Sequence, residues 1–160
     1  ASPMFDYPMM KTLHILSSTF LWGTGVGTAF FMVMAHLKKD VSTIRITTQH
    51  VVLADWLFTT PTVILQPLSG VYLMRLMNFP FDSKWFAVVC ALYAITVGAW
   101  LPVVFLQLKL KKITSSLKQD DALPPEYYRT FYQWVSLGFP AAFAMIGLFL
   151  MMVYKPWLSA

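Results

Sequence analysis

Four long apolar runs, separated by short charged segments, set the pattern of this sequence. The first run, Thr12 to Leu37, contains 26 residues without a formally charged side chain and lies between Lys11 and Lys38. About 20 apolar residues, each rising 1.5 Å along a helix, cross the hydrocarbon core of a bilayer, so this run spans a membrane with some tilt. The whole pattern predicts transmembrane helices at about residues 12–37, 47–74, 85–108 and 130–154.

Prolines interrupt the second apolar run. Pro61 and Pro67 each remove a backbone donor and free a carbonyl one turn earlier, which predicts a kinked helix. Neighbouring threonine hydroxyls can donate to backbone groups that the prolines leave exposed. Asp55 is the one formal charge inside this run.

The composition agrees with a membrane protein. Hydrophobic residues make up 58% of the 160 residues, charged residues only 12%, and the mean hydropathy is +0.61, whereas soluble domains are roughly 25% charged. Such a chain cannot cover itself with polar surface, so the lipid bilayer is its expected partner. The net charge of +5 then reports membrane topology rather than nucleic-acid binding.

The basic residues are divided unequally between the two predicted membrane surfaces. The segments after the first and third runs hold eight of them, against four on the other side. The eight are Lys38, Lys39, Arg45, Lys109, Lys111, Lys112, Lys118 and Arg129, and the four are Lys11, Arg75, Lys84 and Lys155. Because cytoplasmic loops are enriched in Lys and Arg, we expect both termini on the non-cytoplasmic side of a single four-helix domain, residues 1–160.

His14 is the main candidate for chemistry, because it lies inside the first run. An imidazole without a partner in hydrocarbon costs several kcal/mol, so it needs a partner or a ligand. In a helix His14 shares a face with Ser18 and Gly25. Small residues such as Gly25 commonly allow close helix packing; the alternative is a flat macrocycle against the bare backbone, with His14 as the ligand of its metal.

Three other intramembrane polar residues are candidates: His36, His50 and Asp55. His36 is 22 residues from His14, about 33 Å along a helix, so the two cannot share one metal. Asp55 should pair with His36, His50 or a hydroxyl and fix packing, or else bind a cation or a proton. Methionines and histidines together provide ligands suited to copper, although methionine more often fills apolar cores.

No classical catalytic set is visible. Cys90 is the one cysteine, so no intramolecular disulfide forms. Neither a Ser-His-Asp set with a shared location nor an HExxH zinc motif occurs. Hydrolysis is therefore disfavoured, and a haem-dependent oxidoreductase is left open.

Several segments carry a family resemblance that covers nearly the whole chain. They are KTLHILSSTFLWGTGVGTAFF (Lys11 to Phe31), ADWLFTTPTVILQPLSGVYL (Ala54 to Leu73), WLPVVFLQLKLK (Trp100 to Lys111) and LPPEYYR (Leu123 to Arg129). The chain resembles the DUF2269 family of bacterial membrane proteins. More distantly, it is similar to the CopD-like group, which includes copper-resistance proteins and HemJ-type protoporphyrinogen oxidases, in its K-x-L-H-I opening and in Thr60, Pro61 and Gly70.

The resemblance implies a haem role for His14, because the histidine of the same opening is implicated in haem b binding in HemJ-like proteins. Those proteins also carry a lysine early in the third helix, and the stretch after Trp85 has none. This departure argues against protoporphyrinogen oxidation but leaves haem binding open.

The sequence thus predicts an all-α bundle of four transmembrane helices in a bacterial inner membrane. The leading functional hypothesis is a redox or electron-transfer protein that binds haem b or a porphyrin through His14, near the outer face. The second axial ligand is left open, with Met151 and Met152 as candidates at that depth. The alternatives are a copper or other metal-ion protein and a cofactor-free assembly subunit, with a membrane partner or a homo-oligomer left open.

Overall fold

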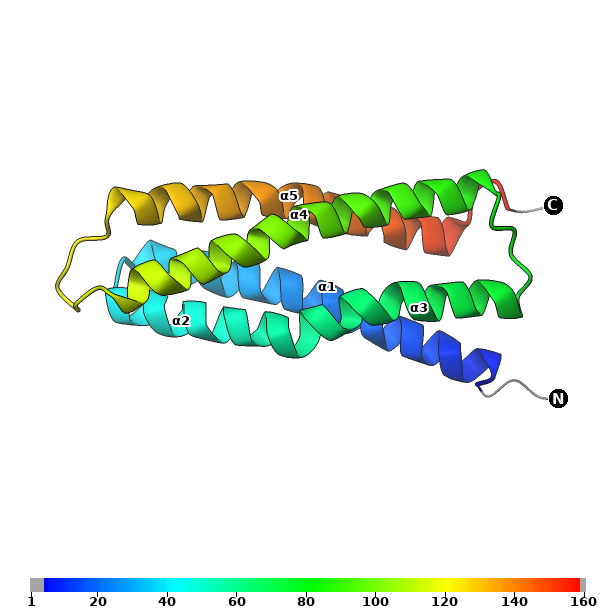
Figure 1. Ribbon diagram of the computed structural model, residues 1–160, viewed down its shortest axis with the longest axis horizontal. Coiled ribbons are helices and arrows are strands. Elements are labelled where there is room, and N and C mark those ends of the chain that lie inside the picture. Colours follow the sequence, from blue (N-terminus) through cyan, green and yellow to red (C-terminus); the bar gives the residue numbers. More distant parts are fainter. Residues whose placement is uncertain (1–4, 159–160) are drawn as a thin grey trace.

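The computed structural model describes residues 5–158. Most of these residues are helical, and within this range there is no strand (Figure 1). The elements in chain order are α1 (Tyr7–Lys38), α2 (Val41–Ala54), η1 (Asp55–Thr59), α3 (Thr60–Leu76), α4 (Lys84–Ser115) and α5 (Pro125–Tyr154). α2, the single π-helical turn η1 and α3 follow one another without a break. They form one span, and the structure therefore has four helices long and apolar enough to cross a membrane, as predicted.

Each helix is longer than the apolar run that predicted it. α1 begins at Tyr7 because Asp6 caps it, accepting a hydrogen bond from the amide of Met9 at 3.0 Å. Ser83 caps α4 in the same way through the amide of Phe86. Local caps set the helix ends, whereas the first charged residue of each loop only sets the edge of the apolar run.

The π-helical turn η1 is the structural form of the kink predicted in the second span. Pro61 has no amide hydrogen to donate, so the preceding turn widens, and the amide of Thr60 reaches the carbonyl of Asp55. The hydroxyl of Thr60 donates to the same carbonyl at 3.0 Å, and that of Thr62 donates to the carbonyl of Phe58 at 2.7 Å. Threonine hydroxyls thus donate to the backbone near Pro61, as predicted, whereas the Val63 carbonyl that Pro67 frees accepts from the hydroxyl of Tyr93. The span changes direction where α2 passes into α3 (Figure 1).

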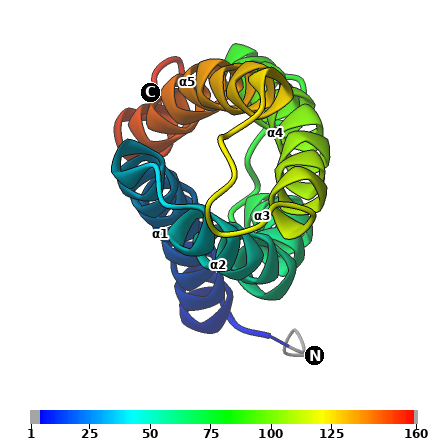
Figure 2. The same cartoon turned by 90° about the vertical axis from the view of Figure 1, so that its left-hand side faces the viewer.

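The four spans are arranged in a ring when viewed along the bundle (Figure 2). α1 packs against α2, η1 and α3 on one side and against α5 on the other, while α4 packs against α2 and α5. The start of α1 and the end of α5 lie at one end of the bundle, here called the terminal end (Figure 1), which agrees with the prediction that both termini lie on one side of the membrane. The α1–α2 and α4–α5 connections lie at the opposite end, called the loop end.

The outside of the bundle is apolar. Phe105, Phe143 and Val153 are 69%, 68% and 75% exposed, as expected for side chains that face lipid. The largest buried cluster lies in the loop half and contains Met32, Ala35, Ile44, Val51, Leu110, Tyr127, Phe131 and Trp134. Smaller clusters around Leu21 and around Met74 hold the helices together elsewhere.

Candidate functional site

His14 lies on α1 in the terminal half of the bundle, against α3. Its Nδ1 is 2.6 Å from Oγ of Ser69, 55 positions away in the sequence. The ring also lies close to the backbone of Gly70, where an added Cβ would come within 3.3 Å of His14 Cε1. Ser69 is buried and His14 is half-buried. Gly70 therefore provides the close approach that lets the imidazole rest on α3.

The hydrogen bonds of Ser69 bear on which nitrogen of His14 carries the proton. The Ser69 hydroxyl donates to the carbonyl of Leu65, one turn earlier, at 2.7 Å. When the Ser69 proton goes to this carbonyl, Ser69 Oγ accepts from His14, and Nδ1 is then the protonated nitrogen of the neutral ring. Nε2 then carries a lone pair, and it has no hydrogen-bond partner among residues 5–158. A neutral imidazole in this state is a ready metal ligand.

None of the other residues predicted around His14 is hydrogen-bonded to it among residues 5–158. Ser18 is half-buried and its hydroxyl donates to the carbonyl of Ile15, within its own helix, at 2.7 Å. Gly25 is exposed and lies 11 residues from His14, about 16 Å along α1; an added Cβ there would meet nothing within 4 Å. Met151 is buried in the cluster that contains Met74 and Trp85, and Met152 packs against that cluster.

A buried polar chain crosses the loop half of the bundle and joins three spans. The amide nitrogen of Gln107 on α4 donates to Asp55 Oδ2 at 2.5 Å, and Thr59 donates to Asp55 Oδ1 at 2.8 Å. The indole Nε1 of Trp134 on α5 donates to Gln107 Oε1 at 2.9 Å. All four side chains are buried. Of the partners predicted for Asp55, a hydroxyl is confirmed, namely that of Thr59. His36 instead contacts Tyr127, and His50 is exposed.

His36 is buried at the loop end of α1 among aromatic rings. Its Nδ1 is 2.8 Å from the hydroxyl of Tyr127, and its ring stacks on Phe131 with centroids 3.9 Å apart. Lys39 Nζ is 2.9 Å from His36 Nε2. Because the ammonium group can only donate, Nε2 accepts, and the Nδ1 proton goes to Tyr127. Both ring nitrogens of His36 are therefore occupied within the protein.

His50 is exposed on α2. It lines a groove of about 650 Å³ between α1 and α2, together with Gly23, Gly27 and several threonines. The three histidines thus lie in separate environments. Within residues 5–158 no group of three His, Cys, Asp or Glu side chains is close enough to hold a metal ion.

Outside the membrane spans, Asp40 is the carboxylate with the clearest electrostatic role. It caps α2: its Oδ2 accepts from the hydroxyl of Thr43 at 2.6 Å and from the Thr43 amide at 2.9 Å, and Gln119 donates to Oδ1. These donors, the Thr43 hydroxyl first, favour the ionised form and lower the pKa of Asp40 below its ordinary value of 3.8. The same cap holds the 116–124 loop against the start of α2.

Sequence reasoning missed the partners of the candidate residues. Ser69 and Gly70 follow Pro67 in the second span, and nothing in their spacing indicates that they meet His14. Gln107 had a usable signal, since it is an uncharged polar residue inside the third apolar run and therefore needs a buried partner. The indole N–H of Trp134 can only donate a hydrogen bond, so it needs a buried acceptor such as the amide oxygen of Gln107.

Together, the four apolar spans, the lipid-facing surface and the internally bonded polar residues define an integral membrane protein of the multi-pass helical class. The model of one family, described as predicted integral membrane protein (DUF2269), matches residues 8–156. The chain belongs to this family, as the resemblance predicted. No curated protein and no solved structure matches it.

Proposed function

We propose that this protein binds haem b or a related porphyrin in a membrane, with a redox or electron-transfer role, and that His14 is an axial ligand. The observation that carries the proposal is the hydrogen bond between His14 and Ser69. With the Ser69 hydroxyl donating to the Leu65 carbonyl, the proton of His14 is on Nδ1, and the Nε2 lone pair of this intramembrane imidazole has no partner among residues 5–158. A metal centre would satisfy that lone pair.

The residues around His14 fit the needs of an axial histidine. A ligating histidine usually donates its other ring N–H to a neighbouring group, which fixes the ring orientation and raises the basicity of the ligating nitrogen. Ser69 fills this role, and its own bond to the Leu65 carbonyl holds it in place. Gly70 leaves room for the ring against α3. Bound haem would supply one-electron chemistry at its iron, while the apolar spans would tune its potential.

Copper or another metal ion is less well supported. Among the His, Cys, Asp and Glu side chains of residues 5–158 no group of three converges on one point, so a copper site would have to combine methionine ligands with a single histidine. His36 uses both ring nitrogens within the protein. Haem requires only one or two protein ligands, so His14 alone can hold it.

A cofactor-free assembly subunit is the second candidate. It is favoured by the Asp55–Gln107–Trp134 chain, in which each side chain has its partner inside the bundle. Polar residues of that kind specify packing between membrane helices and need no ligand. On this account the polar groups position a surface for another membrane protein.

The test is an absorption spectrum of the detergent-purified protein from haem-replete cells, followed by a pyridine haemochrome assay. We expect a Soret band and α and β bands that appear on reduction with dithionite. A colourless protein that also takes up no added haemin would contradict the proposal and favour the assembly subunit. Metal analysis of the same sample distinguishes copper from haem iron.

A further inference from the structure

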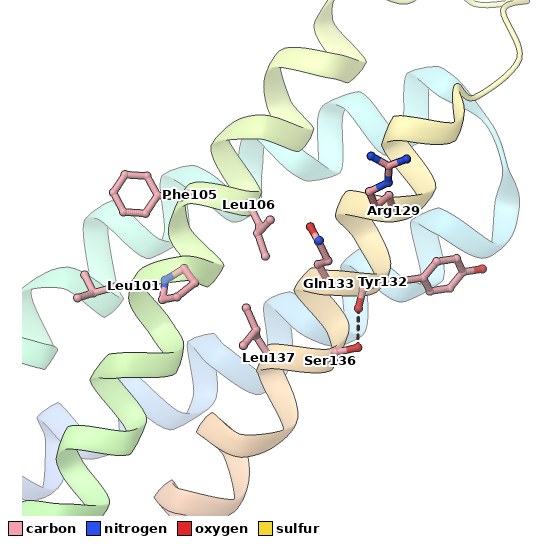
Figure 3. Close-up of a pocket in the computed structure, with 9 residues that line it drawn as sticks. Leu101, Phe105, Leu106, Arg129, Tyr132, Gln133, Ser136 and Leu137 are labelled. Atoms are coloured by element: carbon pink, nitrogen blue, oxygen red, sulfur yellow. Dashed lines mark hydrogen bonds between the residues drawn. The ribbon is translucent and has the colours of Figure 1, made fainter.

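A second surface of the bundle, in its loop half, has features of a ligand site. It is a groove of about 830 Å³ between α4 and α5, shown in Figure 3. The lining residues are Leu101, Pro102, Phe105, Leu106, Arg129, Tyr132, Gln133, Ser136 and Leu137. Most of the lining is apolar, and the polar residues all come from α5. A volume of this size lies within the usual range for small-molecule sites.

Arg129, Gln133 and Leu137 are spaced four residues apart on α5, so they form one stripe along the helix. In Figure 3 the side chains of Gln133 and Leu137 point from α5 towards α4, Leu106 points back from α4, and Arg129 lies nearer the loop end of α5. Leu101 also belongs to the lining. The stripe therefore changes from charged to polar to apolar as it runs from the loop end into the bundle. Its length is about 12 Å at 1.5 Å per residue, close to one leaflet of a hydrocarbon core roughly 30 Å thick.

The mouth of this groove is positively charged. Arg129 lies one turn inside α5, which begins at Pro125 after a polar loop, so it is at the depth of lipid headgroups. Glu126 is the nearby acidic residue, and it pairs with Lys109 at 3.5 Å. The side chains of Arg129 and Gln133 have no hydrogen-bond or ion-pair partner among residues 5–158, so a strong anion-binding group is left free at the mouth.

We propose that this groove binds an anionic glycerophospholipid. Arg129 holds the phosphate, Gln133 donates to the glycerol ester oxygens one turn deeper, and an acyl chain lies between Leu101, Leu106 and Leu137. The charge at the mouth favours a lipid with net negative charge over a zwitterionic one, because basic pockets between transmembrane helices bind anionic headgroups. The site lies in the half of the bundle opposite His14 and does not depend on a haem.

Native mass spectrometry of the detergent-purified protein, titrated with dioleoyl phosphatidylglycerol or phosphatidylcholine, tests this site. We expect one phosphatidylglycerol to bind about tenfold more tightly than phosphatidylcholine, and Arg129→Ala to remove that preference. Arg129→Lys should keep part of it, because lysine retains the charge without the planar fork. Arg75→Ala is the matched control, since Arg75 is an exposed arginine at the terminal end of α3, and it should leave the preference unchanged.

A second pair of variants tests the acyl-chain part of the groove. Leu137→Trp fills the groove and should weaken the binding of both lipids, whereas Val153→Trp, at a position 75% exposed on the same helix, should not. Equal affinity for the two lipids in the wild type, or an unchanged preference in Arg129→Ala, would overturn the proposal. If Arg129→Ala does not fold, unaltered lipid binding in Leu137→Trp overturns it instead. A stable dimer that Leu137→Trp dissociates would assign the groove to a second copy of the chain and also overturn it.

Discussion

The hydrogen bond between His14 Nδ1 and Ser69 Oγ, 2.6 Å long, joins α1 to α3 and determines which nitrogen of the imidazole is free. We infer that His14 donates and Ser69 accepts, because the serine hydroxyl has the Leu65 carbonyl as an acceptor at 2.7 Å. The functional proposal depends on this direction. With the opposite direction, Nε2 would carry the proton and could not ligate a metal.

Ser69→Ala should weaken haem binding without abolishing it. The substitution removes the acceptor for the Nδ1 proton, so the ring loses its fixed orientation and part of its basicity. Loss of such a supporting group typically lowers metal affinity by about 10–100-fold, and a titration with haemin measures the change. Ser18→Ala is the comparison, because the Ser18 hydroxyl bonds within its own helix and its loss should leave affinity unchanged. Equal affinity in Ser69→Ala and wild type would count against the assigned role of Ser69.

Gln107→Leu should destabilise the bundle, because it removes the residue that links α4 to both Asp55 and Trp134. Asp55 Oδ2 loses its donor and the indole N–H of Trp134 loses its acceptor, so both atoms are unsatisfied in a buried position, while Thr59 still donates to Asp55 Oδ1. We expect a loss of roughly 1–2 kcal/mol in the free energy of unfolding, since polar contacts between membrane helices contribute up to about that amount. Thermal unfolding in detergent measures it, with exposed Gln49→Leu as the control. Equal stability of the two variants would show that the chain does not hold the spans together.

Tyr127→Phe should remove the hydrogen bond to His36 and keep the stacked rings. The expected loss is about 1 kcal/mol of unfolding free energy, measured in the same thermal assay. Tyr132→Phe is the control, because Tyr132 is exposed and its hydroxyl has no partner in the described part of the chain. In a His36→Phe background the effect of Tyr127→Phe should disappear, and an effect that persists there would mean that Tyr127 acts through another residue.

The Asp40 cap predicts a pH-dependent contribution to stability. Its pKa is lowered in the folded state, chiefly by the Thr43 hydroxyl, so the folded protein binds a proton at this site less readily than the unfolded chain. The contribution is therefore fully present above the ordinary pKa of 3.8 and is lost as the pH falls through the lowered folded-state value.

Melting temperatures of wild type and Asp40→Ala, measured from pH 7 to pH 2, check this prediction. The difference should be constant between pH 7 and about pH 5 and should shrink below about pH 4. Asp120→Ala, in the exposed loop, serves as the control and should follow the wild type. A difference that stayed constant down to pH 2 would assign the effect to the loss of the capping acceptor for Thr43 rather than to the charge of Asp40.

The sequence predicted the membrane spans because each is a long apolar run with at most one formal charge, Asp55 in the second. It also predicted the kink near Pro61 and its threonine hydroxyls, because both follow from local backbone chemistry. The helix ends differ, since Asp6 and Ser83 cap the helices in segments that lie outside the apolar runs. A hydropathy pattern contains no information about such caps.

The contacts of the candidate site could not be predicted from local sequence patterns. His14 and Ser69 are 55 positions apart, and Asp55 and Gln107 are 52 apart. Which residues meet depends on the rotation and depth of each helix in the bundle. Large apolar residues occur on the exposed as well as the buried sides of these helices, so the sequence does not mark one face as the buried one. The sequence therefore identified His14 and Asp55 as residues in need of partners but did not identify the partners.

The reduced-minus-oxidised spectrum of His14→Ala, compared with that of His50→Ala, tests the central proposal most directly. Both variants replace one histidine, but His50 is exposed on α2 and lies outside the His14 environment. We expect His50→Ala to keep the haem α and β bands and His14→Ala to lose them, with both proteins retaining wild-type helical circular dichroism. Haem retained in full by His14→Ala would contradict the assignment of His14 as the axial ligand.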